Sequence, residues 1–198
     1  MNIFYLDRDP KLCAEMHVDK HVVKMILEYA QLLSTAHRIL DGTQSVGLSK
    51  TGRKQVRYVL SDDREHILYS ATHINHPSAQ WVRQSAANYM WLAELLEECC
   101  IEYSYRYGKI HKVESSGLMQ TLKNSFPKNI SSGKWSEPTP AMPDDIKVEH
   151  DSIASYRKYY IMNKQHLWSW KGKINSREIP KWLTEFFKQA KESLYAQI

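Results

Sequence analysis

The sequence has no long hydrophobic run, few cysteines, and neither an internal repeat nor a low-complexity tract. No segment approaches the roughly 18 uninterrupted apolar residues of a membrane-spanning helix, so we expect no membrane partner. The N-terminal stretch MNIFYLDRDPKL lacks an apolar signal core, and we expect no secretion signal. Cys13, Cys99 and Cys100 are odd in number and two of them are adjacent, which is typical of packing residues rather than of a disulfide scaffold. These features predict a protein of a reducing cytoplasm.

The charge of the chain is unevenly distributed. Residues 1–100 hold 11 Lys and Arg against 12 Asp and Glu, whereas residues 101–198 hold 16 against 10. The net charge is therefore −1 in the first half and +6 in the second. Such an asymmetry favours a polyanionic partner such as nucleic acid.

Apolar periodicity predicts a mainly α fold: a single compact helical domain over residues 1–198, with long irregular loops and a short N-terminal extended segment. Residues 150–198 could instead form a packed helical extension. The predicted helices span Pro10 to about Leu40, Ser61 to Thr72, Pro77 to about Tyr107, Leu118 to Lys123, His150 to His166, and Pro180 to the end. Asp9 is expected to cap the first helix, and Gly108 to end the third. The stretch DGTQSVGLSKTG and residues 125–148, which contain four prolines, are predicted to be loops.

The helix that contains HVDKHVVKMILEYAQLL has an unusual polar stripe. At 100° per residue, a broad apolar arc leaves one narrow sector occupied by His17, Lys20, His21, Lys24, Glu28, Gln31, Thr35 and Arg38. A carboxylate beside an amine is the arrangement used when an amine attacks carbon and a carboxylate manages protons. The alternative is a solvated face on which Lys24 and Glu28 form an ordinary i,i+4 pair. Asp19 falls near the start of the helix, where capping or pairing with a cation is the favoured role.

The same stripe raises the question of a metal. His17 and His21 are four residues apart on one helix face, the spacing that lets two imidazoles share zinc, and His73, His76 and Glu28 could complete a site. However, the glutamate of an HExxH motif is missing, and the cysteines do not have ligand spacing. We therefore predict no metal and no cofactor.

A second group of polar residues lies in THINHPSAQWVRQSAANYMWL. His76 precedes Pro77 at the mouth of a long helix, where free N–H groups attract anions such as phosphate. Trp81, Asn88 and Arg106 project near one another at the edge of the buried arc of this helix. A buried asparagine needs partners, which makes Asn88 either a structural bracket, the favoured interpretation, or a reader of bases.

Two stretches interleave aromatic and basic residues: YSYRYGKIHK at 103–112 and YRKYYIMNKQHLWSWKGK at 156–173. Cations that hold phosphates beside rings that stack on unpaired bases are what nucleic-acid binding requires. The alternative is core aromatic residues with snorkelling lysines. We interpret the first stretch as packing and the second as a binding surface that includes Arg157, Lys164 and Trp168.

These residues resemble a known family. HINHPSAQWVRQSAANYMWLAELLEECCIEYSYRYGK is similar to the central segment of the pyrimidine-dimer DNA glycosylase (phage endonuclease V-like) excision family, in which an NHP element opens a helix. The N-terminal MNIFYLDRDP and HVDKHVVKMILEYAQLLSTAHR, with the later AMP and YRKYY, resemble uncharacterised phage-encoded proteins of the same layout. The resemblance implies a compact helical fold and DNA with a flipped nucleotide. It also implies a glycosylase/lyase reaction in which an amine attacks C1′ with help from a glutamate.

On this basis we expect a monomeric, phage-type enzyme that acts on pyrimidine bases of DNA in the cytoplasm of a host cell. Glu28 would be the general acid/base and Lys24 or Lys20 the amine or electrostatic stabiliser, while His17 and His21 would transfer protons or contact phosphate. In the family the amine is an N-terminal one, which here would be that of Met1. DNA contacts are expected from His73, Asn75, His76, Trp81, Asn88, Arg106, Arg157, Lys164 and Trp168. Alternatives are a transferase acting on a hypermodified pyrimidine, a metal-dependent nuclease, and a non-catalytic module that binds DNA or a host protein.

Overall fold

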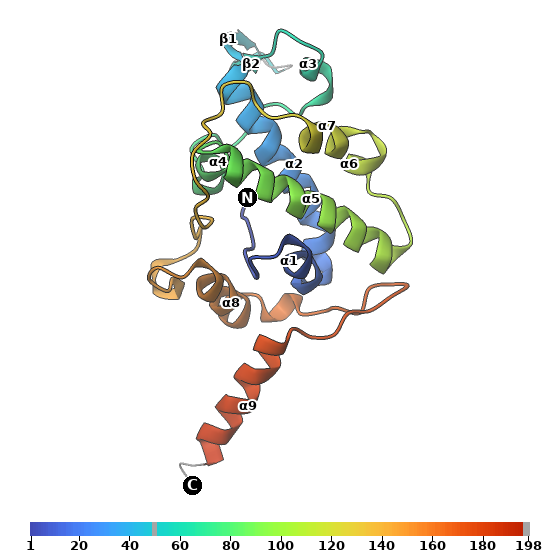
Figure 1. The fold of residues 1–198 in the computed structure, drawn as a ribbon, viewed down its shortest axis with the longest axis vertical. Coiled ribbons are helices and arrows are strands. Elements are labelled where there is room, and N and C mark those ends of the chain that lie inside the picture. The colour runs from blue at the N-terminus through green and yellow to red at the C-terminus, as the bar shows by residue number, and fades with distance from the viewer. Residues whose placement is uncertain (49–50, 196–198) are drawn as a thin grey trace.

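The computed structural model describes residues 1–48 and 51–195, with side chains as far as Ser193. Within these residues the prediction of a mainly α fold is confirmed, since helices dominate and the strands form a single hairpin (Figure 1). The α-helices are α1 Pro10–Met16, α2 Asp19–Asp41, α3 Arg64–Ile67, α4 Pro77–Val82, α5 Ala86–Tyr107, α6 Lys112–Ser115, α7 Leu118–Asn124, α8 Ser152–Asn163 and α9 Lys181–Tyr195. The strands are β1 Thr43–Leu48 and β2 Lys54–Val59, and the short 3₁₀ helices are η1 Asp144–Ile146 and η2 Gln165–Leu167.

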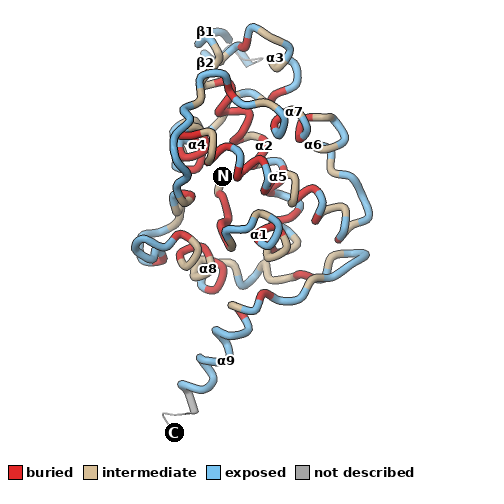
Figure 2. The backbone as a smooth tube through the Cα atoms, in the orientation of Figure 1, coloured by how far each residue is buried: buried red, intermediate tan, exposed pale blue. Residues whose placement is uncertain are grey.

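The core forms where α2 packs against α5 and α1 packs against the same helix (Figure 1). Buried positions of α2 recur at helical spacing, and the extended segment at residues 3–6 lies beneath them, fully or nearly fully buried. Figure 2 shows this buried centre, with α9 almost entirely exposed. The three cysteines are buried and unpaired, which confirms the packing interpretation. No helix in the described ranges has both the length and the apolar character needed to cross a membrane.

The prediction of one continuous helix from Pro10 to Leu40 is wrong, because the chain becomes extended at His17 and Val18. Asp9 does cap the first part, as predicted. The physical cause of the break comes from α5: the Arg106 guanidinium donates hydrogen bonds to the carbonyls of Glu15 (2.8 Å) and His17 (2.9 Å). A second helix then starts at Asp19.

The prediction of one helix from Pro77 to Tyr107 is also wrong, since α4 and α5 are separate. The Ser85 side chain accepts a hydrogen bond from the Asn88 N–H and caps α5 as a new helix. The predicted end is confirmed: Gly108 closes α5 in the left-handed conformation at φ 62°.

The stretch DGTQSVGLSKTG, predicted as a loop, contains β1, the first strand of a β-hairpin whose second strand β2 follows it. β1 and β2 pair antiparallel along their whole length, with Val46 opposite Val56. β-branched residues at these positions favour strands, and Gly52 supplies a positive φ in the turn. Ser49 and Lys50, the remaining residues of that prediction, lie outside the described residues.

The helix predicted over Ser61–Thr72 shrinks to α3. The buried Arg38 side chain explains why, since its guanidinium donates to the backbone carbonyls of Tyr58, Glu65, Leu68 and Tyr69 at 2.5–3.0 Å. Carbonyls that converge on one guanidinium do not all point along a common axis, as the carbonyls of a continuous helix do. The segment therefore wraps around the guanidinium.

The remaining chain follows the prediction more closely. Residues 125–148 run along one side of the body from α7 to α8 with only η1 as regular structure (Figure 1), as their prolines predicted. The helix predicted to reach His166 ends as α8 at Asn163 and is followed by η2. α9 begins at Lys181 and projects away from the other helices (Figure 1).

Candidate active site

The start of the chain, the N-terminal half of α2 and the end of α8 enclose a cavity of about 480 Å³. Its walls carry much of the predicted polar stripe. The lining residues are Met1, Asn2, Phe4, Lys20, His21, Lys24, Met25, Glu28, Ala141, Tyr159, Lys164 and Leu167. The structure thus brings four of the five predicted catalytic residues together, and it adds the first residues of the chain to them.

Glu28 has amines on both sides. Its side chain is only 13% exposed. The Lys24 Nζ lies 3.1 Å from Oε1, and the Met1 nitrogen lies 3.9 Å from Oε2. Lys24 reaches in from the solvent side, since its own side chain is 70% exposed. The carboxylate is therefore within direct proton-transfer distance of Lys24, whereas the Met1 nitrogen forms a longer ion pair with it.

Asn2 holds the start of the chain in place. Its Nδ2 donates to the carbonyl of Ala141 (2.9 Å), and its Oδ1 accepts from the Tyr156 hydroxyl (2.7 Å). Tyr156 belongs to α8, and Ala141 belongs to the proline-rich segment that precedes it. Two elements from the far end of the sequence therefore position the Met1 nitrogen. No sequence signal pointed to Asn2, since its partners are 139 and 154 residues away.

His21 lines the cavity as a neutral ring. It stacks on Phe4 with centroids 4.0 Å apart, and its Nδ1 is hydrogen-bonded to the Tyr160 hydroxyl (2.6 Å). Burial lowers the pKa of His21 to about 2, and the neighbouring His17, Lys164 and Lys24 act in the same direction. A neutral imidazole can donate or accept a hydrogen bond, but it does not carry the charge that attracts phosphate.

His17 is not in the cavity. It is fully buried beneath Phe4, where its Nδ1–H donates to the carbonyl of Cys13 (2.6 Å) and its Nε2 accepts from the Tyr29 hydroxyl (2.9 Å). Burial lowers the pKa of His17 to about 4. Both nitrogens are occupied inside the protein, so the structure gives His17 a packing role and leaves it no path to a ligand.

These buried histidines make the stability pH-dependent. Burial also lowers the pKa of His37 to about 4, with a further contribution from Arg64. Between pH 6.5 and pH 4 the unfolded chain binds protons that the folded chain does not, so the free energy of unfolding falls as the pH falls. Each such histidine removes about 2 kcal/mol between pH 7 and pH 5.

We expect His37→Gln to reduce this pH dependence by about 2 kcal/mol, because one group that titrates only in the unfolded chain is gone. Urea unfolding at pH 7 and pH 5 measures the difference. His66→Gln is the matched control, since His66 is exposed. Equal pH dependence in wild type and His37→Gln would contradict the assignment.

The NHP segment lies within electrostatic reach of the same carboxylate. His76 caps α4 by accepting a hydrogen bond from the Ser78 N–H (3.2 Å). Burial lowers the pKa of His76, the N-terminal amine and His73 lower it further, and Glu28 opposes them. His73 itself is exposed, with φ 49°, and Asn75 is exposed beside it. None of these three residues, His73, Asn75 and His76, lines the cavity.

Three predicted DNA contacts are structural instead. Asn88 brackets the loop at Ser136, since its Nδ2 donates to the Ser136 hydroxyl (3.0 Å) and its Oδ1 accepts from the Ser136 N–H (3.0 Å). Trp81 is buried and donates to the Ser136 carbonyl (3.0 Å). Arg106 is completely buried at the other end of α5. Helical projection predicted these three residues near one another, but the helix axis separates Arg106 from Asn88 by roughly 27 Å.

Arg106 neutralises two carboxylates in the interior. Its Nε lies 2.6 Å from Glu102 and its Nη1 lies 2.9 Å from Asp19. Asp19 also accepts hydrogen bonds from the Ser169 hydroxyl and from the backbone N–H groups of the following turn. The predicted pairing role of Asp19 is confirmed.

Of the three DNA contacts predicted in the C-terminal stretch, only Lys164 lines the cavity. Lys164 lines the cavity and places its ammonium 4.7 Å from the ring centre of Tyr159. Arg157 lies elsewhere, where its Nε donates to the Leu6 carbonyl (3.0 Å) and its guanidinium lies 5.5 Å from the Trp182 ring centre. Trp168 donates to the Tyr160 carbonyl (3.2 Å) and packs edge-on against Phe187. Tyr159, a cavity residue, lies inside the aromatic and basic stretch that indicated binding.

No cluster of three or more His, Cys, Asp or Glu side chains within residues 1–48 and 51–193 has an arrangement suited to a metal ion. Comparison with protein-family models found no matching model, and searches among curated proteins and solved structures found no match. The geometry of the cavity is therefore the basis for any functional proposal.

Proposed function

We propose that this protein is a DNA glycosylase/lyase that releases a pyrimidine base from a flipped nucleotide bound at Glu28. The observation that carries the proposal is the half-buried carboxylate with an amine on each side, 3.1 Å and 3.9 Å away, inside a cavity of about 480 Å³. Imine-forming enzymes need this pair, since an amine must attack carbon while a neighbouring group moves protons.

In the proposed reaction an unprotonated amine attacks C1′ of the deoxyribose. The N–C1′ bond forms as the glycosidic bond breaks, and the base leaves with the electron pair and takes up a proton. The attacking nitrogen then loses one proton to Glu28, its lone pair forms the C1′=N bond as the C1′–O4′ bond opens, and O4′ takes that proton from Glu28, which leaves a protonated imine. Removal of a C2′ proton eliminates the 3′ phosphate, and water hydrolyses the imine to regenerate the amine.

The surroundings of Glu28 suit a nucleotide. Lys20 and Lys24 are exposed at the rim, and Lys164 adds a third ammonium, which together provide positive charge for phosphates. Phe4 and Tyr159 both line the cavity; Phe4 is nearly buried and already stacks on His21, so the half-buried ring of Tyr159 is the surface available to a base. Aromatic surfaces of this kind stack on unpaired bases. A flipped nucleotide thus has a place for its phosphate, at the lysines, and a place for its base, at the aromatic ring.

We expect borohydride to trap a covalent adduct between the protein and DNA that contains pyrimidine photodimers or abasic sites, because borohydride reduces an imine to a stable amine. Peptide mass spectrometry then identifies the nitrogen. Label on Met1 assigns the α-amine, and label on Lys24 or Lys20 assigns a side chain.

The control separates this site from accidental amines. Lys11→Gln removes an exposed lysine of α1 outside the cavity and should leave trapping unchanged, whereas Glu28→Gln should suppress it. Tight DNA binding without any adduct on any pyrimidine lesion would overturn the proposal and leave a non-catalytic DNA-binding protein.

A further inference from the structure

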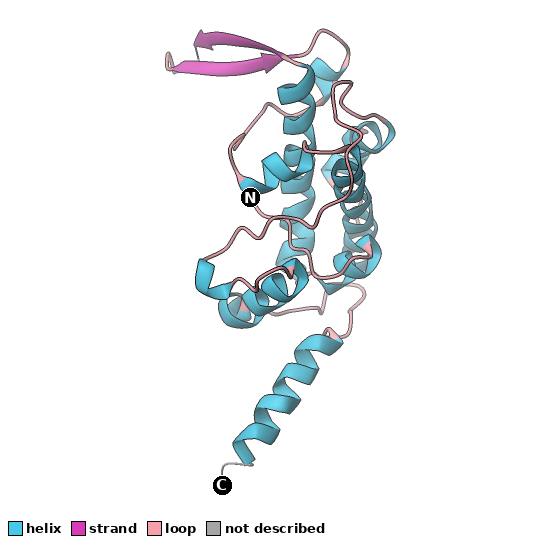
Figure 3. Cartoon of the chain, turned by 60° about the vertical axis from the view of Figure 1, so that its left-hand side comes forward, coloured by secondary structure: helices cyan, strands magenta, loops and turns pink. Residues whose placement is uncertain are grey.

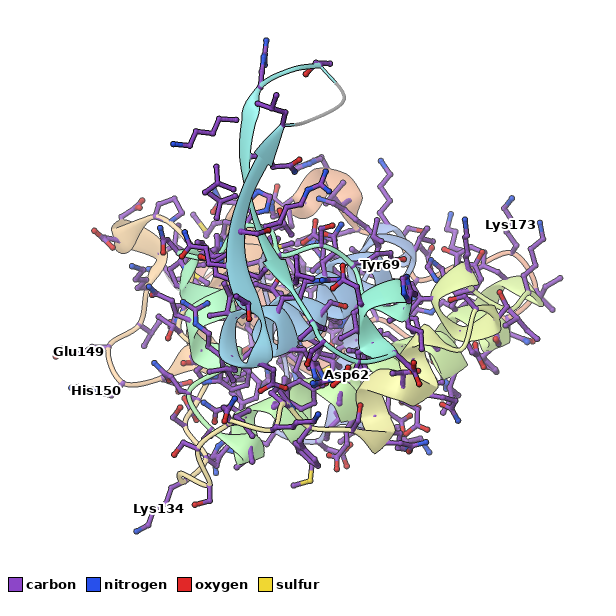
Figure 4. All side chains as sticks on the ribbon, turned by 90° about the horizontal axis from the view of Figure 1, so that it is seen from above. Asp62, Tyr69, Lys134, Glu149, His150 and Lys173 are labelled. Carbon is purple, nitrogen blue, oxygen red and sulfur yellow. The ribbon has the colours of Figure 1, made fainter. Side chains whose placement is uncertain are left out.

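The β1–β2 hairpin stands clear of the rest of the molecule (Figure 4). All of β1 is exposed, as is all of β2 except Tyr58. An isolated two-stranded ribbon is marginally stable in water, so a partner on such a ribbon would stabilise it. No described residue of the hairpin lines the cavity, and the proposed chemistry does not explain the role of the hairpin.

The charge of the hairpin has a single sign. Residues 42–60 include Lys50, Arg53, Lys54 and Arg57 but no Asp or Glu. Arg57 hydrogen-bonds only to the side chain of its neighbour Gln55 (3.3 Å), and neither Lys54 nor Arg57 forms an ion pair with a carboxylate of the described residues. Several basic residues of the helical body do have such partners, for example Arg38, Arg64 and Arg106. Lys54 and Arg57 therefore present cations without a carboxylate partner among the described residues, which suits a polyanion.

The register divides the ribbon into two faces. Val46 opposite Val56 and Leu48 opposite Lys54 share one face, on which the three apolar side chains are 47–70% exposed. Ser45 opposite Arg57 lies on the other face. The major groove of duplex DNA has hydrogen-bonding base edges and thymine methyl groups at its floor and phosphates along both margins, and it admits a two-stranded ribbon. A ribbon with an apolar strip and cations at both faces matches that surface.

The hairpin lies on the same side of the molecule as the cavity. Figure 3 shows the hairpin and the N-terminus, whose first residues line the cavity, on the same side of the molecule. At the base of the hairpin, Tyr58 is within electrostatic reach of Arg83, whose guanidinium binds the carbonyl of Ile74 in the NHP segment (2.7 Å). Along α2 the distance from Glu28 to Asp41 is roughly 20 Å. That is about six base pairs of duplex.

We propose that the β1–β2 hairpin is a second DNA contact, which binds the groove of the duplex that flanks the nucleotide held at Glu28. This inference rests on the proposed function for the position of the DNA. It names double-stranded DNA with at least one flanking half-turn as the preferred substrate.

The test compares Lys54→Gln/Arg57→Gln with Lys11→Gln/Lys109→Gln, a control pair of exposed lysines that removes the same charge elsewhere. We expect the hairpin pair to weaken binding to a 30-base-pair lesion duplex about tenfold at low salt, and to reduce the slope of log K against log salt by about one to two. A lesion duplex too short to reach the hairpin should show no such difference. Equal losses in the control pair, or equal losses on the short duplex, would overturn the hairpin assignment.

The same experiment distinguishes the two proposals. Loss of long-duplex binding by the hairpin variant, when borohydride traps no adduct with the wild type, would refute the chemistry and retain the hairpin contact. Trapping with wild-type duplex affinity in the hairpin variant would retain the chemistry and refute the contact.

Discussion

Glu28→Gln is expected to slow base release by about 10²- to 10⁴-fold, the range that a general acid or base contributes. The glutamine keeps the size and the hydrogen bonds of the side chain but can no longer accept a proton from an amine or deliver one to O4′. Both amines stay in place, so DNA binding should change little. Single-turnover release of the base at saturating lesion DNA measures the effect on the chemical step alone.

Glu94→Gln is the matched control, because Glu94 is exposed on α5 and outside the cavity. It removes the same negative charge and should leave the rate unchanged. A Glu28→Gln protein that keeps its thermal unfolding midpoint and still releases base at the wild-type rate would remove the carboxylate from the mechanism.

Arg106→Met is expected to reduce the free energy of unfolding by about 3–5 kcal/mol, the cost of removing one partner from a buried ion pair. Arg106 is fully buried, and its loss would strip the cation from Asp19 and Glu102 and leave the carbonyls of Glu15 and His17 without a donor. Arg177 still pairs with Glu102 (2.8 Å), so Asp19 would lose more. Urea unfolding at pH 7 measures the change.

Two further variants test the physical cause. Lys109→Met removes an exposed cation at the end of the same helix and should change stability by less than about 0.5 kcal/mol. Asp19→Asn combined with Arg106→Met should cost less than the sum of the single changes, because the asparagine leaves no carboxylate without its cation. Additive effects would show that packing, rather than charge, accounts for the loss.

Local sequence determined the features that depend on neighbouring residues. Asp9 and Pro10 begin α1, Gly108 ends α5, and the prolines of 125–148 prevent a helix. The stripe on α2 was visible for the same reason, since it follows from helical spacing alone. Glu28, Lys24 and Lys20 could therefore be selected as a group before their surroundings were known.

Other features depend on contacts between distant residues, which local patterns do not encode. Arg106 reaches back about 90 positions to interrupt the first helix, and Arg38 gathers carbonyls up to 31 positions away that would otherwise continue a helix. Both arginines are buried, and general preference places arginine on the surface. Interpretation of the sequence alone consequently made two helices too long and placed Arg106 on a binding surface.

The sequence by itself determined which side chains share a face of each helix, because that depends only on the period of the helix. Tertiary structure alone decided which of those faces meet: His17 in the core and His21 at the cavity, and Asn2 tied to Tyr156 so that the Met1 nitrogen lies beside Glu28. The physical reason is that each of these outcomes is a packing contact between separate segments. Such contacts exist only when the whole core has assembled.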